Sequence, residues 1–254
     1  MARIITICNA KGGVGKTTTA INLGAYLAAL GKYVLLVDMD SQANATGGLG
    51  ISIPIDHENI YHAIVNDQNP LSMIKRTTIF GFDVLPATQA LAGATVELVS
   101  MDEREYRLRK ALNSLRTNYD YILIDCPPSL GMLTVNALTA GDNVIIPVQC
   151  EYYALEGLGQ LLHAIDLIKQ SLNPDLQVLG VLLTMYDKRI QLNRHVVNEV
   201  TKNFPGRVFD TIISRTIDLA EAPSYGKPII QFSPSSKAAN EYRRLAEEVI
   251  KLTL

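Results

Sequence analysis

The chain has 254 residues, of which 48% are hydrophobic and 19% charged, and its formal net charge is −2. This size and composition fit a globular fold whose core needs neither disulfides nor structural metals, and they exclude wholesale disorder. No run of about 18 apolar residues occurs, so no membrane-spanning helix is expected, and a net charge near zero does not by itself indicate a nucleic-acid partner.

Apolar, β-branched runs alternate with helical patterns along the chain. Five runs predict strands buried on both faces: Arg3–Cys8, Tyr33–Asp38, Tyr121–Asp125, Asn143–Val148 and Leu176–Thr184. Helices are predicted at Thr17–Leu30, at Arg104–Arg116 and around Tyr242–Ile250, while Gly47–Thr78 is expected to form short helices and loops. The alternation indicates an α/β fold with a doubly wound, mostly parallel sheet, in a single domain covering residues 1–254.

The N-terminus and the cysteines say little about the function. The apolar stretch at the N-terminus is too short for a signal peptide, so the expected location is the cytoplasm. The cysteines are Cys8, Cys126 and Cys150, without a Cys-x-x-Cys pair. We interpret them as small buried residues at strand ends, and the alternative is an iron–sulfur ligand at Cys126.

A glycine-rich loop links the first predicted strand to the first predicted helix. It reads Lys11-Gly12-Gly13-Val14-Gly15-Lys16-Thr17-Thr18. The glycines let the backbone turn tightly and approach phosphate oxygens, and the N–H groups at the helix start form a positive cradle. Lys16 is placed to contact the β- and γ-phosphates, and the Thr17 hydroxyl to ligate Mg²⁺. The loop therefore predicts a site for ATP and Mg²⁺, and the alternative is a glycine-rich turn that binds nothing.

The loop departs from the general phosphate-loop pattern at its entrance, where Ala10 replaces a glycine and Lys11 adds a second lysine. Lys-Gly-Gly-x-Gly-Lys-Thr-Thr resembles the deviant Walker A motif of the ParA/MinD superfamily of P-loop ATPases. The resemblance implies that Lys11 reaches across a dimer interface to the nucleotide of the other subunit. The alternative for Lys11 is a solvated loop charge.

Three aspartates at predicted strand ends are candidates to complete the site. Asp125 looks like the Walker B residue of the superfamily, which is implied to hold Mg²⁺. Asp40 matches a residue implied to orient the attacking water, which makes Asp40 a predicted catalytic residue beside Lys11 and Lys16. Asp38 lies closer to its strand and is predicted to support the metal shell. A helix or turn cap is the alternative for Asp38 and Asp40.

The resemblance extends over most of the chain. The segments that carry it are Ile145–Gly157, Val181–Met185 and Leu219–Pro228, which are similar to the Soj/ParA branch. That branch implies a switch: ATP joins two subunits into a homodimer, the dimer binds double-stranded DNA without sequence preference, and a ParB-like partner stimulates a slow hydrolysis. The implied role is chromosome or plasmid partitioning on the nucleoid, and relatives that position other cargo share the motifs.

The DNA-binding residues are predicted from the same branch. Residues 187–251 hold eleven Lys/Arg against eight Asp/Glu, whereas the rest of the chain holds twelve against seventeen. The matching positions are Lys188 and Arg189, with Arg194 nearby; Arg243, Arg244 and Lys237 could join them after dimerisation. The alternative for each is an ordinary solvated side chain.

Two departures from the family pattern concern binding. Ile213-Ser214-Arg215-Thr216 resembles a segment that usually reads Ile-Pro-Arg-Asn and borders the adenine, so base contacts are predicted for Ser214, Arg215 and Thr216, with hydroxyls replacing the usual groups. Asp218 stands where relatives commonly carry a basic residue, which predicts a weaker or displaced DNA patch.

Three rival functions stay open. A MinD-type membrane-associated ATPase is disfavoured because the chain ends directly after a core-like helix, so no membrane partner is expected. An electron-transfer ATPase like the nitrogenase iron protein would need a second cysteine in matching context. The third rival is a scaffold that binds ATP without hydrolysing it.

Overall fold

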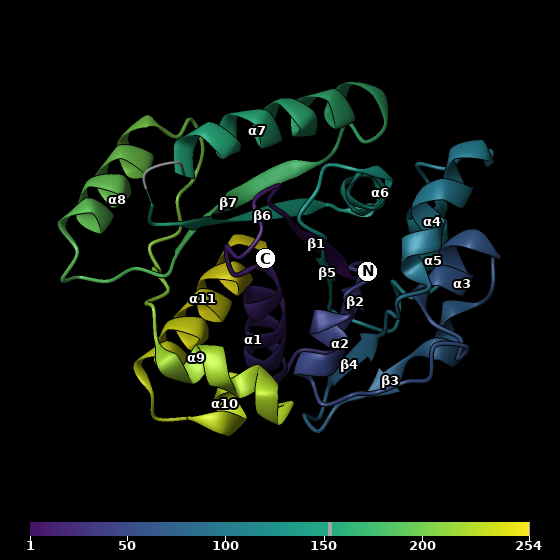
Figure 1. Ribbon diagram of the computed structural model, residues 1–254, viewed down its shortest axis with the longest axis horizontal. Coiled ribbons are helices and arrows are strands. Elements are labelled where there is room, and N and C mark those ends of the chain that lie inside the picture. Colours follow the sequence, from purple (N-terminus) through teal and green to yellow (C-terminus); the bar gives the residue numbers. More distant parts are fainter. Residues whose placement is uncertain (152–153, 254) are drawn as a thin grey trace.

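A single sheet runs through the computed structural model, which describes residues 1–151 and 154–253. Over the described residues its strand order is β3-β4-β2-β5-β1-β6-β7 (Figure 1). The strands are β1 (Arg3–Ile7), β2 (Val34–Asp38), β3 (Lys75–Arg76), β4 (Phe82–Leu85), β5 (Tyr121–Asp125), β6 (Asn143–Gln149) and β7 (Gln177–Thr184). Only the pairing of β3 with β4 is antiparallel among these strands. The predicted doubly wound, mostly parallel fold is confirmed.

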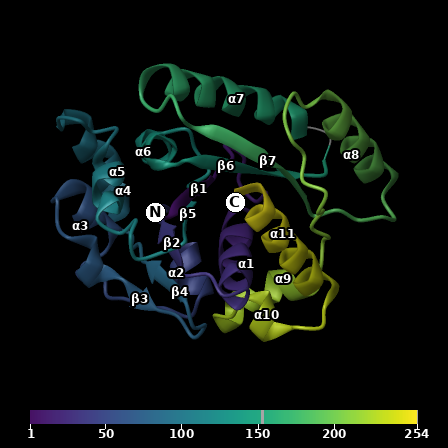
Figure 2. The ribbon, with the colours of Figure 1, turned by 180° about the vertical axis from the view of Figure 1, so that it is seen from behind.

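Helices cover both faces of the sheet (Figures 1 and 2). One face buries apolar residues of α3 (Ile60–Val65), α4 (Leu91–Glu97), α5 (Arg107–Asn113), α6 (Met132–Ala140), α7 (Ala154–Ser171) and α8 (Gln191–Asn203). The opposite face buries α1 (Lys16–Ala29), α2 (Asn44–Gly48), α10 (Ile229–Phe232) and α11 (Lys237–Thr253). The remaining short elements are α9 (Ile217–Glu221) and the 3₁₀ turns η1 (Pro70–Met73), η2 (Leu98–Ser100) and η3 (Ala222–Tyr225). No described helix is both long enough and apolar enough to cross a bilayer.

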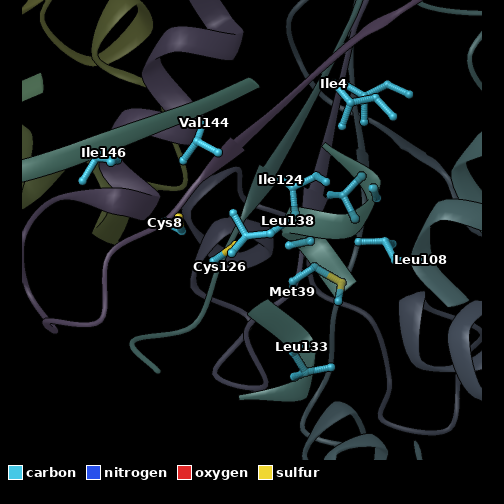
Figure 3. Close-up of a cluster of buried hydrophobic side chains, with 14 of the residues drawn as sticks. Ile4, Cys8, Met39, Leu108, Ile124, Cys126, Leu133, Leu138, Val144 and Ile146 are labelled. Carbon is cyan, nitrogen blue, oxygen red and sulfur yellow. The ribbon is translucent and has the colours of Figure 1, made fainter. Parts of the chain in front are cut away.

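The register of the central strands brings the candidate site together. Asp125 pairs with Ile7 of β1 on one side and with Asp38 of β2 on the other. The ends of β1, β2 and β5 therefore lie level at one edge of the sheet, which is where ligands bind in open α/β folds. The buried strand residues behind this edge, among them Ile4, Ile124 and Val144, hold it in place (Figure 3).

Two expectations about elements need correction. The helix predicted at Arg104–Arg116 is shorter, because the Asn136 side chain binds the chain where the helix starts: its Nδ2 donates to the Arg104 carbonyl and its Oδ1 accepts from the Leu108 N–H. Strand β4 was not predicted, although it pairs with β2 in the sheet. Part of the segment 145–157 that resembles the Soj/ParA branch, residues 152 and 153, lies outside the described residues.

The three cysteines are buried, as expected for small residues at strand ends. Cys8 and Cys126 follow β1 and β5 directly and lie in the same core cluster (Figure 3). Burial raises the pKa of the Cys8 and Cys150 thiols to about 12, which makes them unreactive.

Candidate functional site

The glycine-rich loop connects β1 to α1, as the sequence predicted. Gly13 and Gly15 have φ values of 72° and 89°, a left-handed conformation that side chains disfavour. Gly15 precedes the first residue of α1, so the N–H groups of the first turn face the loop. The shape of this loop therefore depends on glycine at both positions.

Residues outside the motif anchor the loop from both sides. Asn9 Nδ2 donates to the Pro147 carbonyl at 2.7 Å, and Asn9 Oδ1 accepts from the Lys11 N–H at 3.0 Å. Thr184 Oγ1 donates to the Val14 carbonyl at 2.8 Å. The Val14 side chain is buried, so only its backbone can face a ligand. Sequence reasoning missed Asn9 and Thr184, because neither contact follows from spacing along the chain.

The Lys16 side chain folds back onto the backbone of its own loop. It is buried, and its Nζ donates to the Lys11 carbonyl at 3.1 Å. Burial lowers the pKa of Lys16, while neighbouring acids, Asp125 foremost, act to raise it. A cation held beside the N–H groups at the start of α1 is suited to an incoming anion.

Asp125 lies under the loop without a hydrogen-bond partner. The residue is fully buried, and neither carboxylate oxygen has a partner. Burial and then Asp38 raise the pKa of Asp125 well above its usual range, and the nearby Thr17 hydroxyl and Lys16 oppose this. An unpartnered carboxylate beside a threonine hydroxyl is the kind of donor set that Mg²⁺ and its bound water use, so these residues fit the ion.

The carboxylate of Asp38, unlike that of Asp125, accepts several hydrogen bonds. Its Oδ2 accepts from the Thr46 N–H at 2.8 Å and from the Thr46 hydroxyl at 2.7 Å, and its Oδ1 accepts from the Asp40 N–H at 3.2 Å. Burial raises the pKa of Asp38 to about 6. These bonds favour the alternative that Asp38 caps the turn between β2 and α2, and the metal-shell role stays a prediction.

Asp40 lines the hollow in front of the loop. One of its oxygens accepts from the Gln42 N–H at 3.0 Å, which fixes the carboxylate in the turn after β2. The hollow measures about 420 Å³ and is also lined by Lys16, Thr17 and Thr18, and by Lys227 from the far end of the chain. The structure thus brings Asp40 to the loop, as predicted.

Lys11 pairs with an acid for which the sequence predicted no role. Its Nζ lies 3.2 Å from Glu151 Oε2, and the Lys11 side chain is 42% exposed. Arg215 Nη2 approaches the same carboxylate at 3.8 Å. Glu151 therefore links the phosphate loop to the segment 213–216, through exposed ion pairs that are each worth only about 0–1 kcal/mol.

A second hollow of about 220 Å³ continues from the first. Both are lined by Gly15, Thr18, Met185 and Leu219, and the second adds Ser214, Arg215 and Thr216. Met185 has a φ of 54°, a conformation rare for a side chain of this kind, and it directly follows β7. The segment predicted to border the base thus lines a hollow that adjoins the phosphate loop, and its contact with a base stays a prediction.

Both hydroxyls in that segment already bind the protein. Ser214 Oγ donates to Glu241 Oε1 at 2.7 Å, and Thr216 Oγ1 accepts from the Leu219 N–H at 3.4 Å as the N-cap of α9. A hydroxyl has one donor and two acceptor positions, so Ser214 can still accept, and Thr216 can still donate and accept. The predicted base contacts of these hydroxyls stay predictions.

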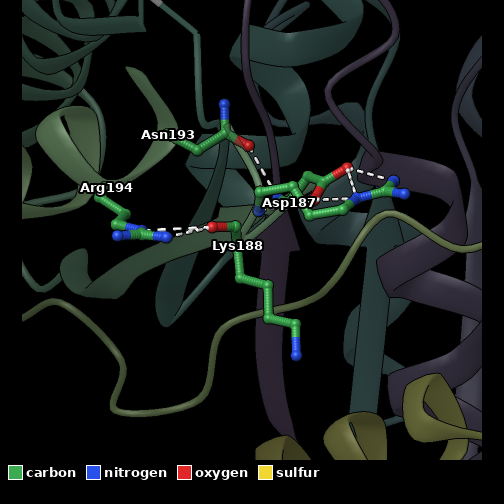
Figure 4. Close-up of polar contacts among 5 residues, drawn as sticks. Asp187, Lys188, Asn193 and Arg194 are labelled. Carbon is green, nitrogen blue, oxygen red and sulfur yellow. Dashed lines mark hydrogen bonds and ion pairs between the residues drawn. The ribbon is translucent and has the colours of Figure 1, made fainter. Parts of the chain in front are cut away.

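The basic residues predicted to bind DNA fall on two elements. Lys188 and Arg189 precede α8 and Arg194 lies in it (Figure 4). Asp187 engages Arg189 through both carboxylate oxygens, and Arg194 donates to the Lys188 carbonyl at 2.7 Å. Arg243 and Arg244 lie on α11, which packs on the face opposite α8. Within one protomer, the basic residues of the α8 region and those of α11 therefore lie in helix layers on opposite faces of the sheet.

The glycine loop between β1 and α1, with a buried carboxylate after β5, defines a P-loop nucleotide-binding protein of the deviant Walker A type. The profile of the family described as AAA domain matches residues 2–178. The sporulation initiation inhibitor protein Soj of Bacillus subtilis is 56% identical over 98% of each chain. The chromosome partitioning protein ParA of Myxococcus xanthus is 54% identical over 99% of this chain and 89% of that protein. The chain belongs to the ParA/Soj family of partitioning ATPases.

A solved structure shares the fold closely. Cobyrinic acid a,c-diamide synthase from Mycobacterium smegmatis, with bound ADP and magnesium, is 39% identical, with a TM-score of 0.88 over 99% of this chain and 95% of that chain.

Proposed function

We propose that this protein is an ATP-dependent dimerising switch. In the ATP-bound dimer it binds DNA without sequence preference, and with a ParB-like partner it drives chromosome or plasmid partitioning in the cytoplasm, on the nucleoid. The family membership and the names of the two relatives support the role. The single observation that carries the nucleotide chemistry is Asp125, fully buried under the phosphate loop without a partner.

The proposed cofactors are ATP and Mg²⁺, because the Mycobacterium smegmatis structure holds ADP and magnesium. When bound, the ion neutralises charge on the β- and γ-phosphates. Thr17 and Asp125 would hold it, and Lys16 would turn from the Lys11 carbonyl toward the phosphates. Asp40, fixed by the Gln42 N–H at the mouth of the hollow, would orient the attacking water.

The dimer step rests on Lys11. In the free chain Lys11 pairs with Glu151 on the surface, and such an exposed pair costs about 0–1 kcal/mol to break. Lys11 can therefore leave Glu151 and supply positive charge to the nucleotide of a second subunit. A charge that arrives only on dimerisation explains why turnover by the single chain is proposed to be slow.

Nucleotide binding and hydrolysis are tested together by calorimetry and phosphate release. Wild type is expected to bind Mg-ATP and release phosphate slowly, Lys16→Ala to lose binding, and Asp40→Ala to bind ATP while phosphate release falls to background. Phosphate release by Asp40→Ala at the wild-type rate would contradict the role of Asp40. If the wild type bound Mg-ATP but released no phosphate, the alternative of a scaffold that binds ATP without hydrolysing it would be the one supported.

Dimerisation and DNA retention are tested with Asp40→Ala, which is expected to hold ATP. Light scattering should show a dimer with Mg-ATP and a monomer without it, and Lys11→Ala in the same background should bind ATP yet stay monomeric. DNA retention should require ATP in the wild type and vanish in Lys11→Ala. DNA retention that is indifferent to nucleotide would refute the switch.

Two alternatives are separated by further measurements. A MinD-like positioning ATPase would co-sediment with liposomes in the presence of ATP, whereas the partitioning switch would stay in the supernatant. A ParA-like positioner of other cargo would share ATP-dependent DNA binding, but its ATPase activity would not respond to a ParB-like protein encoded beside it.

A further inference from the structure

A buried carboxylate of α11 binds the segment that borders the second hollow. Glu241 is 8% exposed, and its Oε2 accepts from the Ser214 N–H at 2.8 Å while its Oε1 accepts from the Ser214 hydroxyl at 2.7 Å. Its remaining polar contact is Lys237 Nζ, 3.5 Å from Oε1. Glu241 is thus occupied on both oxygens by one serine.

The backbone path of the segment explains why this partner is needed. Residues 213–215 run beside the end of β7: the Tyr186 N–H donates to the Ile213 carbonyl, and the Arg215 N–H donates to the Tyr186 carbonyl, both at 3.0 Å. In this parallel arrangement the N–H of Ser214, between them, faces away from β7. Ser214 is 6% exposed, so without Glu241 its N–H would be buried with no acceptor.

The same helix also contacts the helix of the phosphate loop. Tyr242, the neighbour of Glu241, lines the second hollow and lies with its hydroxyl 3.4 Å from Thr19 Oγ1 on α1. One helix therefore sets the distance between the phosphate end of the site and the segment 213–216. A side chain that fixes this segment fixes the width of the hollow that a purine base would enter.

We propose that Glu241 is a positioning residue for the base end of the nucleotide site, acting through Ser214 to hold Arg215 and Thr216 against the base. This inference rests on the proposed nucleotide binding. Beyond that function, it predicts that α11 affects how tightly the site binds the base of the nucleotide and does not affect how tightly it binds the triphosphate. Glu241→Gln keeps the size of the side chain but removes its charge, so both charge-assisted bonds to Ser214 are weakened and the Ser214 hydroxyl has to turn to accept from the amide nitrogen.

Glu248 offers a matched control on the same helix. Its carboxylate accepts from the N–H groups of Asp210 and Thr211 at 2.9 and 3.2 Å, which is the same kind of contact farther along the same segment. Glu248 does not line the second hollow. A merely structural role for such carboxylates predicts the same consequences for Glu248→Gln and Glu241→Gln.

The experiment measures dissociation constants for Mg-ATP and for magnesium tripolyphosphate, which has no base. Glu241→Gln is expected to weaken ATP binding about tenfold while tripolyphosphate binding changes less than about twofold. Ser214→Ala, which keeps the backbone bond, is expected to weaken ATP binding about threefold. Glu248→Gln should leave both constants at wild-type values, and melting curves show that each variant is folded.

Each outcome decides between the two proposals. Wild-type ATP affinity in folded Glu241→Gln, or equal losses for ATP and tripolyphosphate, would overturn the role of Glu241 alone. If Glu241→Gln failed to fold, Ser214→Ala would decide by the same ratio, and a wild-type ratio would overturn the inference. A wild type that binds neither ligand would refute the proposed function as well.

Discussion

Asp125 is placed where it destabilises the ligand-free protein. Its carboxylate is buried among Asp38 and Asp40 with no hydrogen-bond partner, and its pKa is raised well above the usual range by burial and then by Asp38. An acid whose pKa is higher in the folded than in the unfolded chain loses stability as the pH rises through that interval. Asp38, with a pKa of about 6, adds a loss of the same sign between about pH 4 and 6.

The prediction for Asp125→Asn follows from that sign. Without ligand, the variant should melt about 2–4 °C above wild type at pH 7.5, corresponding to ~1 kcal/mol, and the difference should shrink as the pH falls below about 4, where the acid becomes protonated in both states. With Mg-ATP the order should reverse, because only the wild type holds the ion. Thermal melts across pH, with and without Mg-ATP, measure both effects.

Asp120→Asn, at an exposed aspartate that accepts from the Tyr33 N–H, is the control and should show neither the pH-dependent gain nor the reversal. A ligand-free Asp125→Asn that melts below the wild type at pH 7.5 would mean that the carboxylate stabilises the fold, against the geometry.

At the scale of elements, the sequence predicted what local chemistry determines. The five long apolar runs became β1, β2, β5, β6 and β7, within a residue or two of the predicted bounds. Strand β4 was missed because Phe-Asp-Val-Leu is short and carries an aspartate, Asp83, whose carboxylate is satisfied by the Tyr119 hydroxyl from a distant segment. A contact between such distant segments cannot be predicted from the local sequence pattern.

The same limit applies to the candidate site. The glycines and the aspartates of the site follow from the motif, since they come directly after strands in a fixed pattern. Glu151 beside Lys11, and Glu241 beside Ser214, come from segments 140 and 27 residues away. Their positions depend on how the helices pack against the sheet, and the hydrophobic periodicity of the sequence does not predict that packing.

The packing of η3 gives a prediction at this scale. Gly226 ends η3 with a φ of 61°, and a Cβ placed there would lie 2.5 Å from the Gly50 Cα in the loop after α2. Gly226→Ala should therefore cost about 3 kcal/mol, combining left-handed strain with a backbone clash. It should also weaken ATP binding, because Pro223 and Lys227 on either side line the hollow.

Gly31→Ala provides the matched control, since Gly31 has a φ of 82° but nothing within 4 Å of the added Cβ. It should cost only about 1–2 kcal/mol and leave ATP binding unchanged. Urea unfolding measures both costs, and equal losses in the two variants would show that the approach of Gly50 to Gly226 is not close in solution.

At the scale of the whole molecule, the DNA surface depends on which cations are available to phosphates. Arg189 is engaged by Asp187, whose pKa is lowered to about 2 by the hydrogen bonds from Arg189, so the aspartate stays charged at any working pH. Arg194 is turned toward the Lys188 carbonyl. The Lys188 side chain is exposed at this end of α8 and extends away from Arg194 (Figure 4).

This arrangement predicts opposite effects for neighbouring substitutions. Lys188→Ala should weaken DNA binding by the ATP-bound dimer and reduce the slope of log K against log salt by about 2, one phosphate contact per subunit. Asp187→Asn should strengthen DNA binding and steepen the slope, because it frees Arg189 and removes two negative charges per dimer. Lys110→Ala, at an exposed lysine of α5 paired with Glu103, should change neither quantity. Titrations at several salt concentrations separate contact number from affinity, and a Lys188→Ala slope equal to that of the wild type would place the DNA on another surface, the α11 arginines being the next to test.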